Sequence, residues 1–168
     1  MRSIVIGALF EALPSAGITC LRFNFRGVEG STGTFDAGKG ERVDAATAVA
    51  ELSGALPPGV PLVLVGWSFG ADIALALRDA AIAAWFAVAP PLHFTDDPGA
   101  TGRDPRPKML ALGEHDEVRA PADVVAATAE WAATTVEIVP GASHFFVGRT
   151  DRLVRLALGF VDRLTATD

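Results

Sequence analysis

The chain has 168 residues, the size of one ordinary domain, and residues 1–168 are interpreted as a single domain. Half of the residues are apolar and 20% are charged, which excludes an intrinsically disordered protein. The formal net charge of −6 argues against a nucleic-acid partner, because phosphate groups require a basic surface. No apolar run approaches the roughly 20 residues that span a bilayer, so no membrane partner is expected. The single cysteine, Cys20, cannot form an internal disulfide, and no Cys/His cluster has zinc-site spacing.

A helix and a strand are the first elements expected along the chain. Apolar residues at helical spacing predict a helix over residues 2–16, with Gly17 as its stop. The same stretch resembles a secretory signal peptide, but Glu11 interrupts its apolar run, so a cytoplasmic domain is the favoured interpretation. The β-branched and aromatic residues at 18–25 predict a strand, and a Gly-rich loop follows at 26–40.

Helices and short apolar strands alternate along the rest of the chain. Helices are predicted at residues 41–52, 70–79, 122–132 and 152–164, and strands at residues 61–65, 82–89, 108–112 and 135–139. Strands that alternate with crossover helices form a parallel sheet covered on both faces. The sequence therefore predicts an α/β fold, a three-layer sandwich with a mostly parallel sheet. Ligands of such sheets bind beyond the carboxyl ends of the strands, so the loops at those ends are the place to look for a site.

The strongest functional signal is the pentapeptide GWSFG at residues 66–70, which lies between a predicted buried strand and a predicted helix. In that context a G-x-S-x-G sequence is typical of a nucleophile elbow. The turn is so sharp that the positions two before and two after the serine need small side chains, which Gly66 and Gly70 provide. Ser68 is then the candidate nucleophile, and the backbone N–H of Phe69 is the candidate oxyanion donor.

A serine nucleophile needs a base, and the base needs a carboxylate that orients it. Of the three histidines in the chain, His144 directly follows the last predicted strand. Asp116 lies just beyond the predicted strand at residues 108–112. Hydrolases with this elbow order their triad as serine, acid and histidine, and Ser68, Asp116 and His144 follow that order. Glu114 and Glu117 stay open as competing acids.

These motifs resemble the α/β-hydrolase superfamily, and within it the small lidless esterase-like proteins related to dienelactone hydrolases. The matching stretches are residues 21–27, 30–33, 66–70, 89–91, 113–116 and 144–146. The resemblance implies a serine hydrolase of small carboxylic or thio-esters that needs no metal or cofactor. Serine at position 68 argues against dienelactone hydrolases themselves, which carry cysteine there, and against dehalogenases and epoxide hydrolases, which carry aspartate.

The segment at which relatives insert a lid domain is short in this chain. It spans residues 90–107 and contains several prolines, so we expect no lid and an open site. The side chains expected to wall that site are Trp67, Phe69, Pro91, Phe145 and Phe146.

The start of the chain departs from the pattern that the resemblance implies. Relatives have one more strand before the first helix, placed between the strands matching residues 18–25 and 61–65, and the loop after it supplies a second oxyanion donor. An open edge on the 61–65 strand would leave about five buried backbone groups without hydrogen-bond partners, and each would cost roughly 1–3 kcal/mol of stability. We therefore expect either that residues 18–25 shift by roughly 5 Å to pair with residues 61–65, or that the true start codon lies upstream of Met1.

The open edge also has consequences for partners and for function. An unpaired edge strand favours self-association of the chain. The alternative to an enzyme is accordingly a non-catalytic, hydrolase-like domain with a binding or interaction role.

Overall fold

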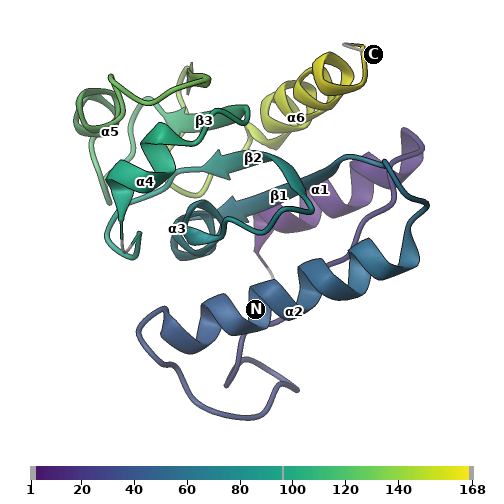
Figure 1. Ribbon diagram of the computed structural model, residues 1–168. Coiled ribbons are helices and arrows are strands. Elements are labelled where there is room, and N and C mark those ends of the chain that lie inside the picture. Colours follow the sequence, from purple (N-terminus) through teal and green to yellow (C-terminus); the bar gives the residue numbers. More distant parts are fainter. Residues whose placement is uncertain (1–2, 96, 167–168) are drawn as a thin grey trace.

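The computed structural model describes residues 3–95 and 97–166 (Figure 1). A four-stranded parallel sheet has the order β1-β2-β3-β4, with β1 at Leu62–Trp67, β2 at Ile82–Val88, β3 at Lys108–Gly113 and β4 at Thr134–Val139. The helices are α1 (Ile4–Ser15), α2 (Lys39–Ala55), α3 (Phe69–Ala76), α4 (Pro98–Arg103), α5 (Pro121–Ala127) and α6 (Thr150–Thr165). Among the described residues, no helix combines the length and the apolar character needed to cross a membrane.

Helices cover both faces of the sheet, which confirms the predicted three-layer α/β sandwich. α1 and α6 form one outer layer and bury one face, where Phe86 of β2 packs against Phe160. α2, α3 and α5 bury the other face, where Leu75 belongs to the same cluster as Trp85 of β2. Because neighbouring residues of β2 point to opposite faces and both faces are covered, this strand is almost wholly apolar.

Residues 18–25 form no strand, so that prediction is wrong. Among the described residues, β1 pairs only with β2, and a cavity of about 1490 Å³ separates its other edge from residues 17–25. Both ends of the segment are held by helices instead of by the sheet. The N–H of Ile18 donates to the carbonyl of Leu13 in α1 at 3.2 Å. At the other end, the backbone N–H and the guanidinium of Arg26 donate to Asp44 of α2 at 2.9 and 2.8 Å. The expected shift toward β1 therefore does not occur.

The segment between β2 and β3 contains one short helix, α4, that the sequence pattern does not predict. The side chain of Asp97 caps it by accepting the N–H of Ala100 at 2.8 Å. Apart from α4, the described part of this segment holds no helix or strand. The other helices and strands begin and end within three residues of their predicted positions, except α5, which ends at Ala127 instead of at residue 132.

The turn from β1 into α3 is tightly constrained. Ser68 has φ 53° and ψ −124°, and its N–H donates to the carbonyl of Val88 at 2.9 Å. A Cβ added to Gly66 would lie 2.2 Å from the carbonyl oxygen of Gly70, whereas one added to Gly70 would first meet the Phe25 ring at 3.8 Å. Position 66 therefore excludes even a methyl group, whereas position 70 leaves room for one.

Gly66→Ala and Gly70→Ala provide a matched test of this constraint. Forcing the backbone apart at position 66 should lower the free energy of unfolding by about 1–3 kcal/mol or more, as overpacking does. Alanine at position 70, in the first turn of α3, should leave stability unchanged or raise it by up to about 1 kcal/mol. Urea unfolding followed by circular dichroism measures both variants, and equal losses would contradict the steric argument.

Hydrogen bonds to Asp104 hold the segment that leads into β3. Its carboxylate accepts hydrogen bonds from Arg106 Nη2 at 2.6 Å and Nε at 3.0 Å, and Arg106 also donates to the carbonyl of Ile82 at 2.7 Å. The adjacent Arg106 guanidinium lowers the pKa of Asp104 from 3.8 to about 2.

The lowered pKa of Asp104 predicts a specific pH dependence of stability. A carboxyl whose pKa is depressed by folding stabilises the protein above its unfolded pKa, near 3.8, and that contribution is lost as the pH falls toward about 2. A shift of this size corresponds to about 2 kcal/mol. Asp104→Asn should therefore lower the free energy of unfolding at pH 7. Below pH 4, the variant should lose less further stability than the wild-type protein. Asp36→Asn, at an exposed aspartate, is the control, and identical acid profiles for the two variants would contradict the prediction.

Candidate active site

Three polar side chains meet beyond the carboxyl ends of the strands. Ser68 follows β1, Asp116 follows β3 and His144 follows β4. His144 Nε2 lies 2.8 Å from Ser68 Oγ, and His144 Nδ1 lies 3.0 and 2.9 Å from the two carboxylate oxygens of Asp116. The imidazole thus lies between a hydroxyl that it can deprotonate and a carboxylate that orients it.

The histidine and its carboxylate are shielded from water, and the serine is more accessible. The side chains of His144 and Asp116 are 5% and 4% exposed, whereas Ser68 is half-buried. The Asp116 carboxylate, 2.9 Å from Nδ1, holds the imidazole with Nε2 turned toward Ser68. The geometry suits transfer of the Ser68 proton to His144.

The two glutamates that compete with Asp116 bind backbone instead of the imidazole. Glu114 Oε2 accepts the N–H of Gly141 at 2.7 Å, and Glu117 Oε2 accepts the N–H of His144 at 3.4 Å. Both hydrogen bonds hold the loop that carries His144. Within the described residues, Asp116 is the carboxylate that contacts the imidazole ring.

The acid loop and the histidine loop pack directly on one another. A Cβ at Gly113 would lie 2.7 Å from the carbonyl oxygens of both Ala142 and Ser143. The N–H of His115 donates to the same Ala142 carbonyl at 2.8 Å. Gly113 begins the matching stretch 113–116, but its packing role is not visible in the sequence, because it depends on a segment some thirty positions away.

The residues that were expected to wall the site do not all lie at its surface. Trp67 Nε1 donates to the carbonyl of His144 at 3.0 Å, so Trp67 also holds the histidine loop. Phe145 is 49% exposed beside the imidazole, with ring centroids 5.5 Å apart. Phe146 is fully buried in the core with the helices α1 and α6, so the prediction that it lines the substrate site is wrong. The turn at positive φ that places Phe146 inside is not visible in the sequence.

Pro91 belongs to a loop that is held from two sides. Its carbonyl accepts a hydrogen bond from Arg119. The buried carboxylate of Asp72 in α3 accepts the backbone N–H groups of residues 92–94 at 2.7 to 3.0 Å. Burial raises the pKa of Asp72, and these three hydrogen bonds oppose the rise. In the sequence, Asp72 could have been singled out because it is the lone carboxylate in the otherwise apolar stretch that forms α3.

Phe69 places both backbone and ring beside Ser68. It is the first residue of α3, and its N–H donates to no acceptor within the described part of the chain, as is usual at a helix start. That N–H is available to an oxyanion. Around it, aromatic rings lie at centroid distances of 4.9 to 5.6 Å from Phe69, namely those of Phe25, Phe35 and Phe94. Phe25 lies in the matching stretch 21–27, whereas no sequence motif indicates Phe35 or Phe94.

Metal-ligating side chains do not converge at this site. Across residues 3–95 and 97–166, no group of three or more His, Cys, Asp or Glu side chains is placed to hold a metal ion.

Comparison with known proteins finds several relatives of the chain, although no protein-family model matches it. The uncharacterized protein RP471 of Rickettsia prowazekii is 33% identical over 161 residues, which are 90% of this chain and 68% of that protein. An α/β serine hydrolase homologue from Coxiella burnetii is 32% identical with a TM-score of 0.82, covering 93% of this chain and 75% of its own.

A third relative is described as having no lid, which is what the sequence predicts for this chain. XC6422 from Xanthomonas campestris, described as an α/β serine hydrolase without lid, is 33% identical with a TM-score of 0.79. The match covers 97% of this chain and 74% of that one. The chain therefore belongs to the α/β-hydrolase superfamily.

Proposed function

We propose that this α/β hydrolase is a serine esterase that cleaves small carboxylic or thio-esters through an acyl-enzyme. The observation that carries the proposal is the contact of His144 with both Ser68 Oγ, at 2.8 Å, and the Asp116 carboxylate, at 2.9 Å. A hydroxyl, an imidazole and a carboxylate in this order constitute an activated nucleophile.

The chemistry follows from these contacts in two halves. His144 takes the Ser68 proton as Oγ bonds to the substrate carbonyl carbon, and the carbonyl oxygen becomes an oxyanion near the Phe69 N–H. Collapse of this intermediate breaks the ester bond, and His144 gives its proton to the departing alcohol or thiol. Water then repeats the sequence on the acyl-enzyme and releases the acid and the free serine. Asp116 keeps Nδ1 of the imidazole protonated throughout.

The surroundings of Ser68 support a small ester with an apolar part. The described part of residues 90–107 carries only the short helix α4, so it forms no separate lid domain. Phe35 and Phe145 are 64% and 49% exposed near the Phe69 and His144 rings. Exposed aromatic rings offer apolar contact to an acyl or alcohol group without enclosing it.

A non-catalytic interaction role is the second candidate function. The observation in its favour is the open edge of β1 beside a large apolar cavity. The two functions differ in whether Ser68 reacts.

Reaction with a fluorophosphonate probe tests the nucleophile. The probe should label the wild-type chain and not Ser68→Ala, because it bonds to a serine Oγ that a base has activated. Ser53→Ala, at an exposed serine of α2, is the control and should label normally. Labelling that survives Ser68→Ala, or no labelling of a folded wild-type chain, would reject the esterase.

Substitution of the acid tests the orienting role. Asp116→Asn should reduce p-nitrophenyl acetate turnover by about 10⁴-fold, because an amide stabilises the wrong imidazole tautomer. Glu114→Gln keeps an oxygen that can accept the Gly141 N–H and should change turnover little. Similar losses in the two variants would mean that Asp116 acts only in loop structure.

A further inference from the structure

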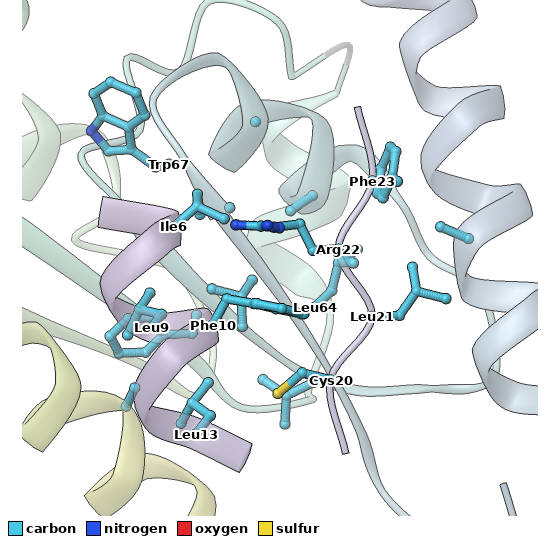
Figure 2. Close-up of a pocket in the computed structure, with 18 of the residues that line it drawn as sticks. Ile6, Leu9, Phe10, Leu13, Cys20, Leu21, Arg22, Phe23, Leu64 and Trp67 are labelled. Carbon is cyan, nitrogen blue, oxygen red and sulfur yellow. The ribbon is translucent and has the colours of Figure 1, made fainter. Parts of the chain in front are cut away.

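Trp67 is the residue directly before the candidate nucleophile, and its indole reaches the candidate base. It is the last residue of β1, where it pairs with Val88 of β2. In Figure 2 its indole nitrogen points away from the labelled side chains that gather between α1 and residues 20–23. The Nε1–H donates to the backbone carbonyl of His144 at 3.0 Å. The strand that leads into Ser68 is thus attached to the residue proposed to activate Ser68.

The loop that carries His144 depends on contacts from outside itself. Its chain passes through positive φ at Gly141, Phe146 and Gly148 and forms neither a helix nor a strand. Ala142 and Phe146 are fully buried and anchor the loop in the core on either side of His144. These anchors hold the two ends of a short arch, and the backbone at its centre needs a hold of its own.

Both backbone polar groups of His144 bind side chains of other segments. The carbonyl accepts the Trp67 indole at 3.0 Å, and no other group within the described part of the chain donates to it. The N–H donates to Glu117 Oε2 at 3.4 Å, which is longer than an ordinary N–H···O bond, and the Glu117 side chain is exposed. The indole is therefore the stronger of the two holds on this backbone.

Contacts to the imidazole alone do not fix its distance from the serine. Asp116 holds Nδ1 at 2.9 and 3.0 Å, but a ring held at one nitrogen can pivot about that contact and carry Nε2 away from Ser68 Oγ. Holding the carbonyl of the same histidine removes this freedom, because the backbone and the ring are then both fixed. The Trp67 ring also packs against the imidazole and against Phe145, with centroid distances of 5.5 and 5.7 Å.

We propose that Trp67 is a positioning residue, whose indole N–H holds the His144 backbone so that Nε2 stays within hydrogen-bond reach of Ser68 Oγ. The proposal rests on the esterase function proposed above, and it assigns Trp67 to the alignment of base and nucleophile instead of to the substrate wall. Two contacts close a ring through the elbow: Ser68 Oγ meets the imidazole at 2.8 Å, and the residue beside Ser68 meets the carbonyl of the same histidine. Proton transfer requires this reach, and a misplacement of about 1 Å can cost about 100-fold in rate.

Two replacements of Trp67 separate the N–H from the ring. Trp67→Phe removes the donor and shortens the ring, whereas replacing Trp67 with benzothienylalanine keeps the bicyclic shape and puts sulfur in place of the N–H. Both should lower kcat for p-nitrophenyl acetate by roughly 10- to 100-fold, because both halves of the reaction use His144. KM should stay nearly unchanged, since an interaction that matters only in the transition state lowers kcat and kcat/KM together.

Trp131→Phe is the matched control. Trp131 packs against the core cluster on the opposite face of the sheet from Trp67, where its ring lies against Gly102. The change should lower stability in urea unfolding about as much as Trp67→Phe does, while kcat stays at the wild-type value. A kcat that falls equally in the two variants would show that general destabilisation, and not positioning, is responsible.

Hydrogen exchange gives a readout that does not depend on turnover. The amide protons of His144 and Phe146 are hydrogen-bonded to Glu117 and to the carbonyl of Ser143. Both should exchange several-fold faster in the two Trp67 replacements than in the wild-type chain and in Trp131→Phe, because the loop opens more readily without the indole bond. If the wild-type chain neither hydrolyses esters nor reacts with a fluorophosphonate, the esterase fails, and the exchange data still decide whether Trp67 holds His144.

Three results would overturn the positioning role. A raised KM with unchanged kcat would make Trp67 a substrate contact. Wild-type kcat with benzothienylalanine, together with a low kcat in Trp67→Phe, would assign the effect to ring packing instead of to the N–H. Unchanged exchange at His144 and Phe146 in both replacements would mean that the indole does not hold the loop.

Discussion

The contact between Gly66 and the Gly70 carbonyl is the constraint on which the site depends. It allows β1 to turn into α3 within a few residues and holds Ser68 at a positive φ that few side-chain-bearing residues adopt. The hydrogen bond from Ser68 N–H to Val88 attaches this turn to the neighbouring strand. Ser68 therefore occupies a position set by sheet pairing and by steric exclusion, which holds it rigidly.

The other two site residues are placed by loops that hold one another. Trp67 donates to the histidine loop from the elbow side, and Glu114 and Glu117 accept its N–H groups from the acid loop. The bare backbone at Gly113 permits these loops to touch. Because several weak contacts converge on one short loop, the His144 ring is oriented without a long helix or strand of its own. The buried carboxylate of Asp72 similarly fixes the loop that follows β2.

The open edge of β1 shows that the two halves of the molecule are stabilised differently. The β1 to β4 sheet has continuous pairing and helices on both faces. Residues 18–25 lack such pairing and are positioned by their ends, through α1 and through the Arg26–Asp44 ion pair, which joins half-buried side chains. Segments that are held only at their ends, with unpaired backbone between them, open locally more readily than paired strands.

The sequence by itself determined the features that depend on local pattern. Apolar periodicity predicted all four strands of the sheet and the helices that cover it, and G-x-S-x-G between strand and helix identified the elbow, because these signals lie within one stretch of chain. Chain order also predicted that Ser68, Asp116 and His144 lie at the same edge, since parallel strands end there together.

Only the tertiary structure decided the features that depend on distant neighbours. Residues 18–25 have the composition of a strand but no strand to pair with, and pairing is not a property of one segment. Phe145 and Phe146 are adjacent and alike, yet a turn exposes one and buries the other. The roles of Asp72 and Gly113 likewise appear only when loops far apart in the sequence are brought into contact, because hydrogen bonds and close packing act across space instead of along the chain.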